Sequence, residues 1–369
     1  MKWLPALMLA AGACSPRAAV ETRAAAMETR AAAVDTGDAF AIGDVRAARG
    51  TRASGWLAIH ALGDSGTRIP ISIVHGATDG PTLALVAGTQ GGKVAPIVAM
   101  HRLLDQVDAS TLRGTLIVVH VANMPAFHAR SAYRGPWDGK NGNRVYPGRD
   151  DGTVTERIAA TIVRDVVRRS DYLIDLHAGE PAESLMPFTF AARPGLDART
   201  DSMARELAIA WGVPHILLDR DGPRELATAA YLQTTAHLLR IPALTTMAGE
   251  RGAADSAAVR THVEGSLQVM RRLGMLDGQV PGARRTPPIT FYSGSDMVMS
   301  PSTGLWTPAV VPGDVVAAGA LLGRLVDHFG APLGDVRAEV AGRVLYLLTT
   351  PAVSAGEPVV FLGVGGGEG

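Results

Sequence analysis

Short apolar runs that alternate with stretches of helical periodicity limit what this chain can fold into. Four runs are largely apolar and are expected to form buried strands: residues 69–75, 83–88, 116–121 and 172–176. A turn is expected at residues 76–81, and two stretches between the runs have helical spacing: residues 94–104 and 153–169. The second stretch opens with the capping residues Thr153 and Glu156. Strands that alternate with helices predict an α/β fold whose sheet is covered on both faces.

The pattern changes after about residue 285. Glycines and Pro-Gly turns separate short runs rich in valine and leucine, and no stretch of helical periodicity remains. Turns at such short spacing predict a small all-β domain, either a sandwich or a barrel. We therefore expect an α/β domain over residues 37–285, with globular patterning from about Trp56, and a β domain over residues 286–369.

Residues 1–36 have the pattern of an export signal followed by a tether. Lys2 gives a basic start, and residues 4–13 form an apolar run that is too short to span a bilayer. Cys14 follows Ala-Gly-Ala, as in a bacterial lipoprotein processing box, and residues 15–36 contain two near-identical heptads without an apolar stripe. We expect an exported protein that is periplasmic or anchored to the membrane through lipidated Cys14. An ordinary cleaved signal with an incidental cysteine is the alternative.

Charge and cysteine content exclude several classes of protein. Lys plus Arg (35) balance Asp plus Glu (35), so there is no electrostatic case for binding nucleic acid. A single cysteine permits neither an intramolecular disulfide nor a cysteine-rich zinc cluster. The motifs described next predict a small carboxylate-bearing molecule as the partner.

Four segments of the α/β part, and two of the β part, stand in a recognisable order. They are Gly88-Thr89-Gln90-Gly91-Gly92-Lys93, residues 141–148, Asp175-Leu176-His177, residues 245–250, residues 302–305 and Gly313-Asp314-Val315. Together they resemble the succinylglutamate desuccinylase/aspartoacylase family of zinc-dependent deacylases, relatives of the zinc carboxypeptidases. The resemblance implies a zinc-carboxypeptidase-like mixed sheet flanked by helices, followed by a smaller all-β domain. It also implies hydrolysis of an N-acyl amino acid or a related amide.

The family's chemistry assigns roles to individual residues. A zinc ion held by two histidines and a glutamate activates water, a second glutamate takes the proton, and an arginine binds substrate carboxylate or polarises the carbonyl. By position, His177 matches a metal ligand, Arg144 the arginine and Glu250 the general base. Asn143 and Arg134 are further candidates for contacting substrate. The alternative readings are a structural histidine, surface arginines and an ordinary loop carboxylate.

Two of the three metal-ligand positions differ from the family pattern. Gln90 and Lys93 stand where the resemblance implies a histidine and a glutamate, and an ammonium repels a cation. Zinc is therefore expected from the family, but in a degenerate or atypical site. Lys93 could instead pair with Glu250, hold an anionic ligand together with Arg144, or lie in solvent.

Two functions stay open from the sequence. The first is an exported deacylase that uses Glu250, Arg144 and His177 with an unusual metal site or with none. The second is a non-catalytic protein of the same fold that binds a small carboxylate through Arg144 and Lys93.

The β domain resembles biotinyl-type carrier domains, which carry a lysine that is modified. Residues 339–343, at the corresponding position, offer no lysine. We therefore expect the β domain to form a lid or wall over the cleft of the α/β domain.

Overall fold

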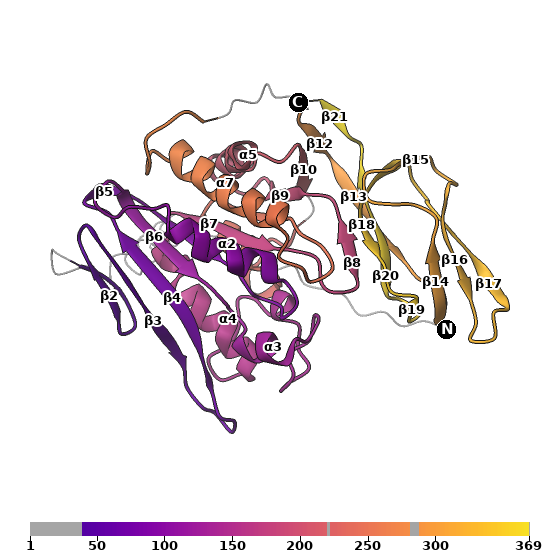
Figure 1. The fold of residues 1–369 in the computed structure, drawn as a ribbon, viewed down its shortest axis with the longest axis horizontal. Coiled ribbons are helices and arrows are strands. Elements are labelled where there is room, and N and C mark those ends of the chain that lie inside the picture. Colours follow the sequence, from indigo (N-terminus) through magenta and orange to yellow (C-terminus); the bar gives the residue numbers. More distant parts are fainter. Residues whose placement is uncertain (1–38, 220–221, 281–287, 369) are drawn as a thin grey trace, which may run out of the picture. The chain divides into compact units, whose positions relative to one another are not determined.

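The structure of the chain is a computed structural model, which describes residues 39–219, 222–280 and 288–368 (Figure 1). The predicted export signal and tether, with Cys14, lie outside the described residues. Within the described ranges, every helix falls short of the length and apolar character that crossing a bilayer requires.

A ten-stranded mixed sheet forms the centre of the α/β part. Its order is β21-β12-β10-β9-β11-β7-β5-β6-β4-β3. The strands are β3 (Thr51–Ile59), β4 (Thr67–His75), β5 (Thr78–Val86), β6 (Arg113–Val119), β7 (Tyr172–His177), β9 (Phe188–Ala192), β10 (His215–Asp219), β11 (Ala243–Met247), β12 (Thr290–Tyr292) and β21 (Gly367–Glu368). Strands β6, β5, β7 and β11 run parallel, whereas β4 and β9 pair antiparallel to β6 and β11. The expectation of a mixed sheet is confirmed.

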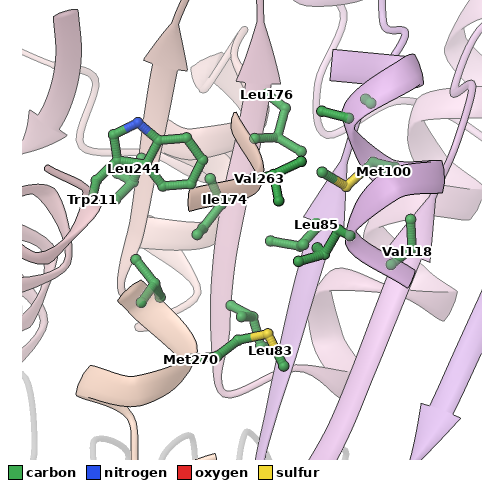
Figure 2. Packing of buried hydrophobic residues seen from close by; sticks show 14 of the residues in the cluster. Leu83, Leu85, Met100, Val118, Ile174, Leu176, Trp211, Leu244, Val263 and Met270 are labelled. Carbon is green, nitrogen blue, oxygen red and sulfur yellow. The ribbon is translucent and has the colours of Figure 1, made fainter. Parts of the chain in front are cut away.

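Helices cover both faces of this sheet. They are α2 (Val94–Leu104), α3 (Met124–Ala129), α4 (Val154–Asp165), α5 (Ala198–Trp211), α6 (Leu232–Leu238) and α7 (Ser256–Arg272). Figure 2 shows one core, in which Leu83 and Leu85 of β5 meet Met100 of α2 and Met270 of α7. On the same strand, Ala84 and Val86 point to a second core with α4 and α6. Alternation between two buried faces explains why this strand is apolar throughout.

Several predicted elements are confirmed, and some boundaries are wrong. Helix α2 spans the predicted residues, and α4 begins after a capping box that Thr153 and Glu156 form as predicted. The fold starts before Trp56, with the hairpin β1 (Ala39–Ile42) and β2 (Val45–Ala48), whose small alanines give only a weak pattern. The turn expected at residues 76–81 is shorter, because β5 begins at Thr78 and pairs irregularly with β6 around Gly80 and Pro81.

The C-terminal part consists of antiparallel sheets, as predicted. One has the order β13-β20-β18-β15, with β8 (Glu183–Leu185) added beside β18, and the other has the order β17-β16-β14-β19. Their strands are β13 (Gly294–Met299), β14 (Gly304–Pro308), β15 (Val315–Val316), β16 (Leu321–Val326), β17 (Pro332–Arg337), β18 (Gly342–Leu348), β19 (Ala352–Val353) and β20 (Pro358–Val364). Because β12 and β21 extend the main sheet and β8 joins β18, the two parts share strands. The boundary at residue 285 stays a prediction.

Candidate functional site

Three parallel strands end side by side at one edge of the main sheet. Val86 of β5 is in register with Asp175 of β7, and His177 of β7 is in register with Met247 of β11. The glycine-rich turn, His177 and the turn that carries Glu250 therefore meet at this edge. His177 is the last residue of β7, whereas the sequence placed it just beyond the strand. In α/β sheets, ligands bind outside the carboxyl ends of the strands.

The loop that carries Asn143 and Arg144 packs on the glycine-rich turn. The Nε2 atom of Gln90 donates to Oδ1 of Asn141 over 2.9 Å, and the same oxygen accepts from the backbone N–H of Asn143 over 2.9 Å. A Cβ atom on Gly142 would lie 2.8 Å from the carbonyl oxygen of Thr89, so the approach requires glycine. All four segments that suggested the family thus converge.

His177 and Asp175 form a buried pair at the end of β7. The Nε2 atom of His177 lies 2.9 Å from Oδ1 of Asp175, although the two groups are not aligned as a hydrogen bond. Tyr146 lies close by, and its pKa is raised chiefly by burial and further by the negative charge of Asp175. Behind them, Nε2 of His262 bonds to the carbonyl oxygen of Ala248, and burial lowers the pKa of His262 to about 4. His262 is therefore a neutral imidazole that holds the backbone of Ala248, just beyond β11, by this hydrogen bond.

Lys93 is buried at the start of α2. Its residue is only 6% exposed, and its ammonium forms no hydrogen bond or ion pair with any residue that the structure describes. The pairing of Lys93 with Glu250 that the sequence suggested is therefore absent. The charge of Lys93 acts instead on the carboxyl group of Glu180. Burial raises the pKa of Glu180 to about 7, and the ammonium of Lys93 opposes that shift.

The glycine-rich turn is shaped to receive the carboxyl group of Glu180. A Cβ atom on Gly92 would lie 2.0 Å from Oε2 of Glu180 and 2.6 Å from Cδ of Pro181. The backbone N–H groups of Gly92 and Tyr133 lie near enough to favour the charged carboxylate, though neither is aligned as a hydrogen bond. A side chain at this position would push the carboxyl group away from the turn.

Glu250 lies three residues beyond β11 and is half-buried. One of its carboxylate oxygens accepts a short hydrogen bond from the hydroxyl group of Ser184. The neighbouring Glu183 accepts a short hydrogen bond from the phenol of Tyr133 and another from the backbone N–H of Glu180, over 2.7 Å. A carboxylate with a hydroxyl partner keeps lone pairs with which it can accept a proton.

Glu183, Ser184 and Tyr133 were missed by sequence reasoning. Ser184 lies on β8, which pairs with β18, and this places Tyr346 of the β part near Glu183. Burial, and then the charge of Glu183, raise the pKa of Tyr346. No local spacing signals a contact between segments so far apart in sequence. A strand of the β part therefore forms one wall of the site.

The two candidate arginines are both exposed but differ in their contacts. The guanidinium of Arg144 stacks on Tyr231, with Cζ 4.6 Å from the ring centroid, and its Nη1 donates to the carbonyl oxygen of Asn143 over 2.7 Å. The Oδ1 atom of Asn143 is buried and has no partner in the described ranges. Arg134 donates to the carbonyl oxygen of Gly139, in its own loop, over 3.1 Å. Arg144 is held by an aromatic ring and by the residue that carries the unpaired acceptor, whereas Arg134 stabilises a turn.

The side chains at the implied metal positions do not fit a zinc ion. The donor chemistry of Gln90, Lys93 and His177 decides this fit. The amide nitrogen of Gln90 is bonded to Asn141, and a protonated lysine at position 93 has no lone pair to donate. His177 is left as the single imidazole at these positions, and structural or catalytic zinc sites use at least three protein ligands.

Comparison with known proteins gives the family. Residues 79–273 match the model of the succinylglutamate desuccinylase/aspartoacylase catalytic domain. The chain is similar to N-alpha-acetyl-L-2,4-diaminobutyric acid deacetylase of Halomonas elongata, with 29% identity over 298 residues that cover 80% of this chain and 85% of the relative.

Solved structures agree with that match. The product-bound ectoine utilization protein EutE (DoeB) of Ruegeria pomeroyi has 26% identity and a TM-score of 0.74, covering 85% of this chain and 95% of that chain. A succinylglutamate desuccinylase of a Silicibacter species has 25% identity and a TM-score of 0.74, covering 85% and 94%. Since the family model spans more than half of the sequence, the chain belongs to the succinylglutamate desuccinylase/aspartoacylase family of amide-hydrolysing deacylases.

Proposed function

We propose that the chain binds an N-acylated amino acid at the carboxyl edge of its main sheet without hydrolysing it. The observation that carries this proposal is the buried, unpaired Oδ1 atom of Asn143, together with the guanidinium of Arg144, which stacks on Tyr231 and donates to the backbone carbonyl oxygen of Asn143. Buried polar atoms in native proteins almost always have a hydrogen-bond partner. A ligand that brings an N–H donor and a carboxylate would satisfy both groups.

An N-acyl amino acid carries that combination of groups. Its amide N–H can donate to Asn143, and its carboxylate can pair with Arg144, whose planar guanidinium suits a two-oxygen acceptor. The similarity to a deacetylase of N-acetyl-diaminobutyrate supports the same substrate class. The side chain and acyl group of the ligand are left to experiment.

The donor set supports binding without turnover. Amide hydrolysis in this family relies on a water molecule activated by zinc, and Gln90, Lys93 and His177 do not form such a site. The residues that bind an acyl amino acid can keep that role in a chain without the ligands for a catalytic zinc ion.

Hydrolysis is the second candidate, and Glu250 favours it. Its half-buried carboxylate, oriented by the hydroxyl of Ser184, has the form of a general base that could take a proton from water. In that case Arg144 would polarise the acyl carbonyl.

Calorimetric titration with product analysis of the same samples separates the two candidates. The ligands are N-acetyl-L-2,4-diaminobutyrate, N-succinyl-L-glutamate and N-acetyl-L-aspartate. We expect saturable binding of at least one ligand, release of no free amino acid, and binding about tenfold weaker or more in Arg144→Ala. Arg149→Ala, which removes an exposed arginine paired with Asp151 in the same region, is the matched control.

Two results would contradict the proposal. Binding of none of the three ligands would remove it. Release of free amino acid that scales with protein concentration and is lost in Glu250→Gln would establish hydrolysis instead.

We also propose that the chain is exported and lipidated at Cys14, as the basic start, the short apolar run and the position of this cysteine suggest. Cell fractionation with a labelled fatty acid tests this. The label should enter the wild-type chain in the membrane fraction and be absent from Cys14→Ser, and label in neither chain would refute lipidation.

A further inference from the structure

We infer that the ammonium of Lys93 takes the place of the metal ion in this site, so that an anionic group of the ligand is held by a fixed side-chain charge and not by zinc. This inference rests on the proposed function, because it assigns a role within the same ligand site. It goes further because it names Lys93 as the source of positive charge in the site and predicts that the site binds no zinc.

Position is the first support. Lys93 ends the turn that follows β5, and that turn meets the ends of β7 and β11. A Cβ atom on Gly252, two residues after Glu250, would lie 3.4 Å from the carbonyl oxygen of Gly92. Lys93 therefore begins α2 at the same edge where His177 ends its strand.

The state of the ammonium is the second support. Lys93 is only 6% exposed, yet within the described ranges its charge has neither a hydrogen-bond acceptor nor an acid within 4.0 Å. The charge of Lys93 acts on the carboxyl group of Glu180, but burial raises the pKa of that group to about 7, and lysine is rarely buried without a closely paired acid. An anionic ligand that accepts from Lys93 would supply such a partner.

The chemistry of the neighbours is the third support. Gln90 offers a metal only its neutral amide oxygen, because its Nε2 atom donates to Asn141, and His177 is the one imidazole at positions 90, 93 and 177. A cation placed among them would also face the ammonium of Lys93, and two like charges in a buried site repel strongly. The side chains at positions 90, 93 and 177 therefore suit an anion better than a divalent cation.

The test measures ligand binding and metal content of the full chain in parallel. The probes are N-succinyl-L-glutamate and N-acetyl-L-2,4-diaminobutyrate, titrated after treatment with a chelator and again after dialysis against zinc. We expect the same affinity in both states and no stoichiometric zinc by elemental analysis. Lys93→Met keeps the buried hydrocarbon stem and removes the charge, so binding should weaken about 10- to 100-fold with the fold intact by circular dichroism.

Lys140→Ala is the matched control, because Lys140 is the other lysine in the described ranges and pairs with Glu156 over 2.7 Å. This variant should bind like the wild type. The inference is overturned if Lys93→Met binds as tightly as the wild type. It is also overturned if near-stoichiometric zinc is retained and lost in His177→Ala, or if chelation abolishes binding. In the chelation case the proposed function survives, whereas failure of the wild type to bind either probe in any state removes both.

Discussion

The Nε2 atom of His177 lies 2.9 Å from Oδ1 of Asp175, and the two side chains are 2% and 1% exposed. The two residues are separated by one position on β7, so their side chains leave the strand on the same face. Tyr146 packs near the same carboxylate. This pair fixes the end of the strand around which the glycine-rich turn and the Glu250 turn are arranged.

Asp175→Asn should destabilise the fold by about 2 kcal/mol, because it replaces a buried carboxylate 2.9 Å from the imidazole of His177, and altering one partner of a buried polar contact costs about 1–3 kcal/mol. Urea unfolding followed by circular dichroism measures this change. Asp79→Asn serves as the control, since the side chain of Asp79 is 95% exposed in its ion pair with Arg49 and its loss should have no measurable effect. Equal stability of Asp175→Asn and the wild type would mean that the pair contributes nothing to folding.

Glu180 predicts a specific pH dependence of stability. Its pKa is raised by burial from 4.5 to about 7 in the folded chain. Between these values the folded state keeps a proton that the unfolded state has lost, so this group makes the fold less stable as pH rises. The effect is roughly 1 kcal/mol per pH unit between pH 4.5 and about 7, and it is constant above that range.

The measurement is the difference in free energy of unfolding between the wild type and Glu180→Gln across this range. The variant should gain on the wild type as pH rises, because a glutamine has no proton to lose. Glu264→Gln, at an exposed position on α7, should show no such slope. Parallel curves for the wild type and Glu180→Gln would refute the raised pKa.

Much of the fold could be predicted because local signals agreed with tertiary placement. The run from Leu83 to Val86 is apolar because successive residues enter two different cores, and Thr153 with Glu156 marks the start of α4 by a contact three residues apart. These signals are contained within a few positions of sequence. The motifs shared with the family likewise identified the glycine-rich turn, the loop at residues 141–148 and the strand ends that meet at the site.

The wall of the site could not be predicted in the same way. Ser184 reaches Glu250 and Glu183 reaches Tyr133 only because β8 pairs with β18, a strand about 160 residues later. A three-residue strand has no periodicity that sequence analysis can detect. The state of Lys93 was equally hidden, since burial and lack of a partner depend on every element that packs around α2.

Gly91 allows a direct test of how closely the glycine-rich turn packs on the neighbouring backbone. A Cβ atom there would lie 2.1 Å from the carbonyl oxygen of Ala126 and 2.7 Å from that of Ser131, and backbone atoms cannot move aside cheaply. Gly91→Ala should therefore cost about 3 kcal/mol of stability and weaken ligand binding. Gly294→Ala is the control, because no heavy atom lies within 4 Å of its Cβ position. Thermal melts that show both variants close to the wild type would contradict the close packing of the turn.

Introducing the donors that the family resemblance implies should create a zinc site, which we expect the wild type to lack. In the double variant Q90H/K93E, an imidazole and a carboxylate replace the amide and the ammonium on the turn that meets the end of β7. With His177, this edge then carries the three protein ligands of a catalytic zinc site. We expect near-stoichiometric zinc after dialysis, measured by elemental analysis, and a rise in melting temperature on adding zinc, because a metal that binds only the folded state stabilises it.

The triple variant Q90H/K93E/H177A tests whether the three positions act together. It should lose most of the zinc gained by the double variant, because a site with two protein ligands binds the metal far more weakly. A folded double variant that takes up no zinc would show that positions 90 and 93 do not converge with His177. Since the only changes are an amide and an ammonium exchanged for metal donors, zinc uptake by the double variant would trace the difference between this chain and a zinc deacylase to those two side chains.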